Sequence, residues 1–165
     1  MNGQVNNTDK NDANGLAQIV KAGRYREVGV KSLDSHTVRS MLGARAQLVG
    51  MRVEVTDQIR GILKTFGIVL SRRTGEPFER LVDEACGDSD TMRGHTVQSL
   101  LRVYSCLKEQ IKQLDRQLMG RARECLCQQL MTIPGVGVLT ALAFVTAVDD
   151  PTKFAKSRSV GAYFA

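Results

Sequence analysis

Two long stretches with apolar residues at helical spacing limit most strongly what this chain can fold into. The first runs from Thr37 to Phe66 and the second from Val97 to Cys125, with apolar side chains mostly three, four or seven residues apart. A helix with one such apolar stripe requires a partner along its length, and the first helix would be about 45 Å long at ~1.5 Å per residue. The two stretches therefore predict an antiparallel, coiled-coil-like helical hairpin connected through residues 67–93. The stripe positions are Val38, Met41, Leu48, Val55, Ile59, Ile62 and Phe66, then Val97, Leu100, Tyr104, Leu107, Ile111, Leu114, Leu118 and Cys125.

The charge balance and the cysteine pattern limit which binding partners and metal sites are expected. The 165 residues include 23 Lys+Arg against 17 Asp+Glu, a formal net charge of +6. This balance fits a polyanionic partner and argues against an acidic one. The 4 Cys form no C-x-x-C pair and are accompanied by only 2 His, so we expect no zinc site, reduced thiols and a cytoplasmic location. The most apolar run, residues 138–148, is shorter than the ~20 residues that span a bilayer, and it predicts a buried helix without a membrane partner.

Local signals predict several shorter elements. Thr8 or Asp9 can cap a helix that ends near Gly23. Alternating apolar residues in the segment 24–30 predict an edge strand or an extended connector. Ser32 or Asp34 can cap the first long helix, and residues 77–86 predict a short amphipathic helix with Pro77 at its first turn.

Asp9 and Asp12 are candidate metal ligands. They stand three residues apart, so they share a face if the segment is the first turn of a helix. Acidic residues are also favoured at helix starts because they complement the helix dipole, and the spacing alone favours this simpler interpretation. The alternative is a carboxylate pair that holds Mg²⁺ or Mn²⁺, ions that prefer oxygen ligands and leave positions for water and phosphate.

Residues 133–137 read IPGVG, the form of a helix-hairpin-helix turn. Its two glycines allow backbone conformations closed to other residues. N–H groups at the start of the following helix suit a phosphate oxygen. Pro134, Gly135, Val136 and Gly137 are therefore candidate DNA-binding residues that would hold the backbone without reading bases. A generic glycine-containing connector between two helices is the alternative.

Basic residues recur along both long stretches. They form either a solvated face of each helix or a ridge that follows the phosphates of a nucleic acid. They are Arg39, Arg45, Arg52, Arg60 and Lys64 in the first, and Lys108, Lys112, Arg116, Arg121 and Arg123 in the second.

Motifs in a fixed order along nearly the whole chain point to one family. They are TDKNDA followed by GLA in residues 8–17, the segment 25–32, parts of the first long stretch, MTIPGVG in residues 131–137, Asp149-Asp150-Pro151, Phe154 and VGAYF in residues 160–164. Together they resemble the RuvC-like DEDD transposases of the insertion-sequence group one-ten, with its eleven-eleven branch.

The resemblance implies roles for particular residues. Asp9 and Asp12 match the last two of the four acidic residues that surround a divalent metal in the family, which makes them catalytic and metal-binding. The family's first two acidic residues and its catalytic serine have no counterpart here. The resemblance therefore predicts a middle piece whose Mg²⁺ or Mn²⁺ binding is weak or absent, and which alone does not cut or join DNA. It implies DNA and a structured guide RNA as partners, and a homo-oligomer formed through the hairpin.

The predicted fold is mainly α. Residues 1–33 would be the C-terminal remnant of a RuvC-like DEDD domain, residues 34–128 the long helical hairpin, and residues 129–165 the start of a C-terminal transposase domain with its helix-hairpin-helix segment. The predicted function is insertion-sequence transposition and recombination of DNA, here in an inactive fragment. One alternative is a non-catalytic DNA-binding or oligomerisation module that regulates a transposase. Another is a structural coiled-coil adaptor in which Asp9 and Asp12 are only helix caps.

Overall fold

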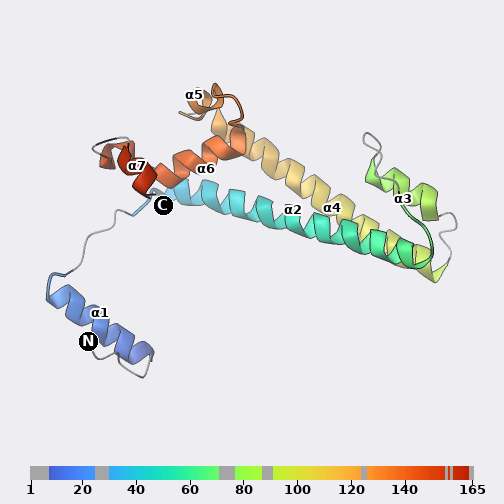
Figure 1. Ribbon diagram of the computed structural model, residues 1–165, viewed down its shortest axis with the longest axis horizontal. Coiled ribbons are helices and arrows are strands. Elements are labelled where there is room, and N and C mark those ends of the chain that lie inside the picture. The colour runs from blue at the N-terminus through green and yellow to red at the C-terminus, as the bar shows by residue number, and fades with distance from the viewer. Residues whose placement is uncertain are drawn as a thin grey trace. The chain divides into compact units, whose positions relative to one another are not determined.

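The structure, a computed structural model, describes residues 8–24, 30–70, 77–86, 91–123, 126–154, 156 and 158–163. Within these residues the regular structure is helical throughout and no strand occurs, which confirms the predicted mainly α class (Figure 1). The helices are α1 (Asp9–Lys21), α2 (Leu33–Thr65), α3 (Phe78–Cys86), α4 (Met92–Ala122), α5 (Cys127–Met131), α6 (Val138–Val148), the short 3₁₀ helix η1 (Pro151–Lys153) and α7 (Arg158–Tyr163).

The chain divides into two compact units, Met1–Val30 and Lys31–Ala165. The described part of the first unit is α1, which begins at the predicted cap Thr8 and ends just before Gly23, a glycine with φ of +63°. Most of the predicted strand or connector, residues 25–29, lies outside the described residues. All seven remaining helices belong to the second unit.

Helices α2 and α4 lie side by side in opposite directions (Figure 1). Three pairs across the helices show this: Asp34 contacts Arg121, Arg45 contacts Asp115, and Phe66 contacts Arg93. Residue numbers fall along α4 as they rise along α2, as an antiparallel arrangement requires. Serine and threonine side chains cap both helices: Ser32 accepts from the Ser35 N–H at 3.1 Å, and Thr91 accepts from the Gly94 N–H at 3.1 Å.

Apolar side chains are buried in two separate clusters, one at each end of the hairpin. The base cluster joins α2, α4, α5 and α6, and the tip cluster joins α2, α3 and α4. Between Val38 and Ile59, α2 has no buried residue, although α4 buries Leu107 and Ile111 there. Apart from Leu107 and Ile111, the buried apolar residues lie in these two clusters, where a third helix covers the pair of α2 and α4. The base cluster is Val38, Leu118, Ala122, Cys127, Ala141 and Leu142, and the tip cluster is Ile59, Leu63, Val82, Cys86, Val97 and Leu101.

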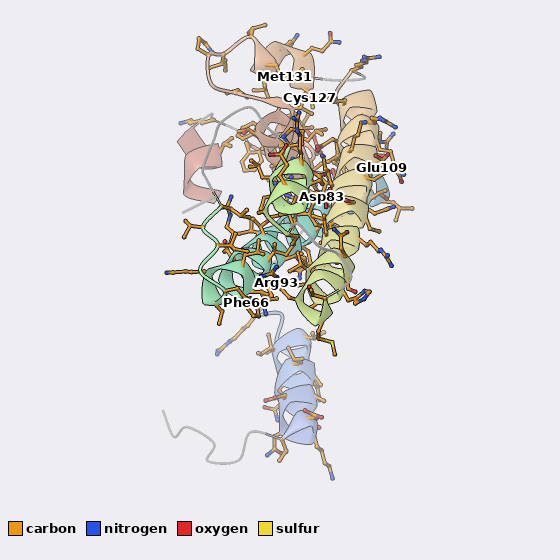
Figure 2. All side chains as sticks on the ribbon, turned by 90° about the vertical axis from the view of Figure 1, so that its right-hand side faces the viewer. Phe66, Asp83, Arg93, Glu109, Cys127 and Met131 are labelled. Atoms are coloured by element: carbon orange, nitrogen blue, oxygen red, sulfur yellow. The ribbon has the colours of Figure 1, made fainter. Side chains whose placement is uncertain are left out.

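Phe66 departs from the predicted stripe. It forms the C-cap of α2 and is 56% exposed, with the guanidinium of Arg93 stacked 5.3 Å from its ring centre. Figure 2 looks onto this end of the hairpin, where the two residues lie together. The helix ends before the stripe can carry the ring inward, because Gly67 follows with φ of +77°.

Helix α3 is held on the hairpin by polar and aromatic contacts as well as by the tip cluster. Lys108 of α4 donates to Glu79 at 2.6 Å, and the rings of Phe78 and Tyr104 are 5.0 Å apart. Burial alone would raise the pKa of Glu79, but the hydrogen bond and charge of Lys108, together with a backbone hydrogen bond, bring that pKa below its usual value. Among the described helices, none is both long and apolar enough to cross a membrane.

Candidate nucleic-acid interface and acidic pair

Asp9 and Asp12 both lie exposed in the first turn of α1. Thr8, not Asp9, is the N-cap: its side chain accepts from the Asn11 N–H, and its carbonyl accepts from Asp12 at 3.0 Å. The two carboxylates therefore do not serve as the N-cap, and they lie in the first turn, where negative charge suits the helix dipole. Across the described residues, no group of three or more His, Cys, Asp or Glu side chains is placed to hold a metal ion.

The rest of α1 is also largely exposed. It has no buried residue, and its apolar side chains Leu16, Ile19 and Val20 are 64%, 45% and 61% exposed. They stand at helical spacing on one side of the helix.

The IPGVG segment forms a tight turn between α5 and α6. The Val136 N–H donates to the Ile133 carbonyl at 3.0 Å, and Gly135 has φ of +86°. A proline at the second position and a glycine with positive φ at the third are the features of a type II turn. The sequence motif thus folds as its residue types require.

Gly137 then begins α6. It is the N-cap residue, with φ of −90° and ψ of 175°, and it supplies no side chain to the first helical N–H groups. Its own carbonyl accepts from the Ala141 N–H at 2.9 Å. Ile133, Pro134, Gly135 and Gly137 are exposed, and Val136 is half-buried. The turn therefore presents uncapped donors at the positive end of a helix dipole.

Apolar contacts attach this turn to the base of the hairpin. Val136, Val138, Leu139, Leu130 and Met131 all pack against the base cluster. Cys127, fully buried in that cluster, anchors α5 near Met131 (Figure 2). The turn is thus carried on a packed support.

Asp149, at the C-terminal end of α6, makes contacts that the sequence did not reveal. It follows α6 and accepts hydrogen bonds from the Ser32 N–H at 3.0 Å, the Ser32 hydroxyl at 2.6 Å and the Ser35 hydroxyl at 2.5 Å. In return, the Lys31 ammonium donates to the carbonyls of Thr146 and Ala147 at 3.3 and 2.6 Å. Each helix end thus receives a group of the charge that suits its dipole.

The hydrogen bonds from Ser32 and Ser35 lower the pKa of Asp149 to about 2. Because its folded pKa lies below the usual value of about 3.9, the carboxylate stabilises the fold at neutral pH. That contribution is lost only as the pH falls from about 4 through 2. A sequence could signal Ser32 as a cap, but not a partner more than a hundred residues away.

The basic residues of the hairpin are partly used inside the fold. Arg45 pairs with Asp115 at 2.5 Å, Arg121 pairs with Asp34, and Lys108 pairs with Glu79. Arg60 donates to the Leu70 carbonyl and lies over the Phe78 ring. The predicted phosphate ridge is therefore shorter than the sequence suggested. Lys108 is itself exposed, and the exposed members of the ridge outside these contacts are Arg39, Lys64, Lys112, Arg116 and Arg123.

Comparison with known proteins adds a family relationship. Residues 127–165 match the family model described as transposase IS116/IS110/IS902 family. The transposase for insertion sequence element IS1111A of Coxiella burnetii is 30% identical in an alignment 171 positions long, which covers 96% of this chain and 44% of that protein. The transposase for insertion sequence element IS1328 of Yersinia enterocolitica is 29% identical, over 95% of this chain and 47% of that protein.

A probable family 20 transposase of Pseudomonas aeruginosa is 26% identical, over 94% of this chain and 47% of that protein. The chain thus spans less than half the length of these curated relatives. No solved structure matches the chain.

Proposed function

We propose that this chain, which is similar over nearly all of its length to transposases for insertion sequence elements and matches the transposase IS116/IS110/IS902 family in residues 127–165, serves DNA transposition by holding the DNA backbone. The observation that carries the proposal is the exposed turn at Pro134–Gly137, with its positive-φ glycine and uncapped helix start. Relatives that align with the chain on both sides of this turn are named transposases.

The chemistry of the proposed contact follows from the turn. The backbone N–H groups at the start of α6 and the positive end of its dipole attract a phosphate oxygen. Gly135 and Gly137 have no Cβ, and open space surrounds the position where one would stand, so a phosphate can approach the backbone closely. The contact does not read bases, because the phosphate is the same at every step.

Binding to two unrelated DNA duplexes of equal length tests the proposal. We expect equal affinities that weaken steeply with salt, because neutralised phosphates release counterions. The logarithm of the binding constant should fall against the logarithm of salt concentration with a slope of about −0.9 for each phosphate that an exposed Lys or Arg neutralises. Fluorescence anisotropy at several salt concentrations measures this slope. Absence of binding at low salt, or binding that salt does not affect, would contradict the proposal.

We further propose that Asp9 and Asp12 hold a divalent metal, Mg²⁺ or Mn²⁺, as part of a larger acidic site. Two exposed carboxylates alone bind Mg²⁺ weakly, because the ion keeps most of its waters. We therefore expect the 165-residue chain to bind DNA without cutting or joining it. A specific product after incubation with Mg²⁺ and insertion-sequence-end DNA would contradict this.

Paramagnetic Mn²⁺ gives a direct test of the acidic pair. Nuclear magnetic resonance should show broadening of amide signals around residues 9–13, and the double substitution Asp9→Asn with Asp12→Asn should abolish it. The N-cap Thr8 is unchanged in this variant, and circular dichroism would check that the helix content is retained. Asp57→Asn, an exposed acid of α2, is the matched control and should leave the broadening in place. Equal broadening in wild type and the double variant would refute the metal site.

A second candidate function is a non-catalytic module that assembles with copies of itself and contacts DNA or a structured guide RNA. The observation in its favour is the thin middle of the hairpin, where Met51, Val53 and Val103 are 40%, 50% and 46% exposed. Burial of such side chains between copies would form a homo-oligomer through the hairpin. Sedimentation velocity separates the possibilities, since a chain that remains a monomer at high concentration is no such module.

A further inference from the structure

The contacts between residues 31–35 and residues 146–149 form a reciprocal cap between two helices. Lys31 serves the carbonyl end of α6, and Asp149 serves the amide end of α2. The partners are 114 to 117 residues apart in the chain. Local chain geometry therefore does not bring these groups together, and the fold has to place them.

The backbone at Asp149 is strained in a way that serves this contact. Asp149 has φ of 63° and ψ of −73°, the only positive φ at a described residue other than glycine. The Asp150 N–H donates to the Val148 carbonyl at 2.9 Å, which closes a γ-turn of the rare, strained kind. Such conformations persist only where surrounding contacts hold them. Here the three bonds accepted by the Asp149 carboxylate are those contacts.

Hydrogen bonds can fix the direction of α6, which apolar packing in the base cluster does not. Apolar burial of Ala141 and Leu142 attaches α6 to the hairpin, but the hydrophobic effect has little directional preference. Hydrogen bonds to a charged group are directional and short. An 11-residue helix is about 16 Å long, so a small swing at its C-terminal end displaces the turn at its other end.

We infer that the reciprocal cap is a positioning device, in which Asp149, Lys31, Ser32 and Ser35 fix the direction of α6 and so the place of the Pro134–Gly137 turn on the hairpin. Lys31 is also the first residue of the larger unit. The geometric part of this inference is independent of DNA, and its functional part rests on the proposed function.

Hydrogen exchange measured by mass spectrometry tests the geometric part. Asp149→Asn removes the charge while keeping the side-chain shape, and exchange in peptides covering residues 31–36 and 145–150 should rise about tenfold or more as the cap opens. Asp150→Asn is the matched control, because Asp150 caps only its own turn through Thr152. Unchanged exchange in Asp149→Asn, or an equal rise in both variants, would overturn the inference.

A second, milder variant tests the inference in case Asp149→Asn disrupts the fold. Ser35→Ala removes one of the three bonds to Asp149 and leaves the acid in place. It should give the same pattern of raised exchange at smaller amplitude, with an unchanged helical circular dichroism signal. If Ser35→Ala leaves exchange at residues 145–150 as in the wild type, the two helix ends are not coupled and the inference fails.

DNA affinity tests the functional part. If the cap positions the turn, Asp149→Asn should weaken binding to duplex DNA severalfold while Asp150→Asn, with the same change of charge, should not. Raised exchange with unchanged affinity would overturn the positioning of the DNA contact. A wild-type chain that binds no DNA would refute the proposed function instead, and the exchange comparison would still decide whether the cap fixes α6.

Discussion

Leu118→Ala is expected to lower the free energy of unfolding by about 3 kcal/mol. Leu118 is fully buried in the base cluster, where α4 meets side chains from α2, α5 and α6. Truncation forfeits the transfer free energy of three carbons and leaves a cavity that three packed helices cannot close completely. Urea unfolding followed by circular dichroism should show a lower midpoint with an unchanged slope.

The next residue supplies the control. Met119→Ala alters the same helix one position further on, at a side chain that is 54% exposed. Met and Ala both favour helix and no cavity forms, so we expect a change within about 0.5 kcal/mol. Leu63→Ala opens a comparable hole in the tip cluster. Equal losses for Leu118→Ala and Met119→Ala would mean that the base cluster does not hold the fold together.

The helices themselves could be predicted because their signals are local. Thr8 and Ser32 cap helices where the sequence offered them as candidates, and α3 begins directly after Pro77. Helix α6 covers the apolar run expected to be a buried helix, although only Ala141, Leu142 and Thr146 are fully buried in it. Caps and periodicity depend on neighbours within a few residues, so one sequence is enough to find them.

The distribution of burial could not be predicted from the same pattern. An apolar stripe shows which face of a helix turns inward, but not whether a third helix covers it. Val55 and Leu114 belong to the predicted stripes yet are only half-buried, while Ile59 and Leu118 are enclosed. The difference depends on where α3, α5 and α6 pack, which is set by contacts between distant parts of the chain.

In the candidate site, too, only the features that depend on neighbouring residues could be predicted. The geometry around Gly135 could be expected, because a Pro-Gly pair sets the turn type locally. The use of Asp149 as a cap for Ser32 and Ser35 could not, since its partners are distant in sequence. Likewise, nothing local revealed that Arg45 and Arg121 pair with acids. Cross-helix register determined which cations stay exposed.

Gly137→Asp is expected to weaken binding to duplex DNA at least about tenfold, equivalent to about 1.4 kcal/mol. Gly137 is the N-cap of α6 in an extended conformation, and a Cβ there meets nothing within 4 Å. Asp is a preferred N-cap residue, so the substitution should preserve or raise the stability of α6. Its carboxylate occupies the donors proposed for the phosphate and repels the phosphate charge. Affinity and thermal stability should therefore change in opposite directions.

Gly137→Asn separates charge from shape in this experiment. Asn caps a helix about as well as Asp and has nearly the same size, but it carries no charge. If the turn binds phosphate, Asn should cost far less affinity than Asp at low salt, and the gap between the two should narrow as salt screens the charge. Equal affinities for Gly137→Asp, Gly137→Asn and wild type would place the DNA contact elsewhere. The exposed cations of the hairpin would then be the remaining route to the backbone, since their attraction does not depend on the start of α6.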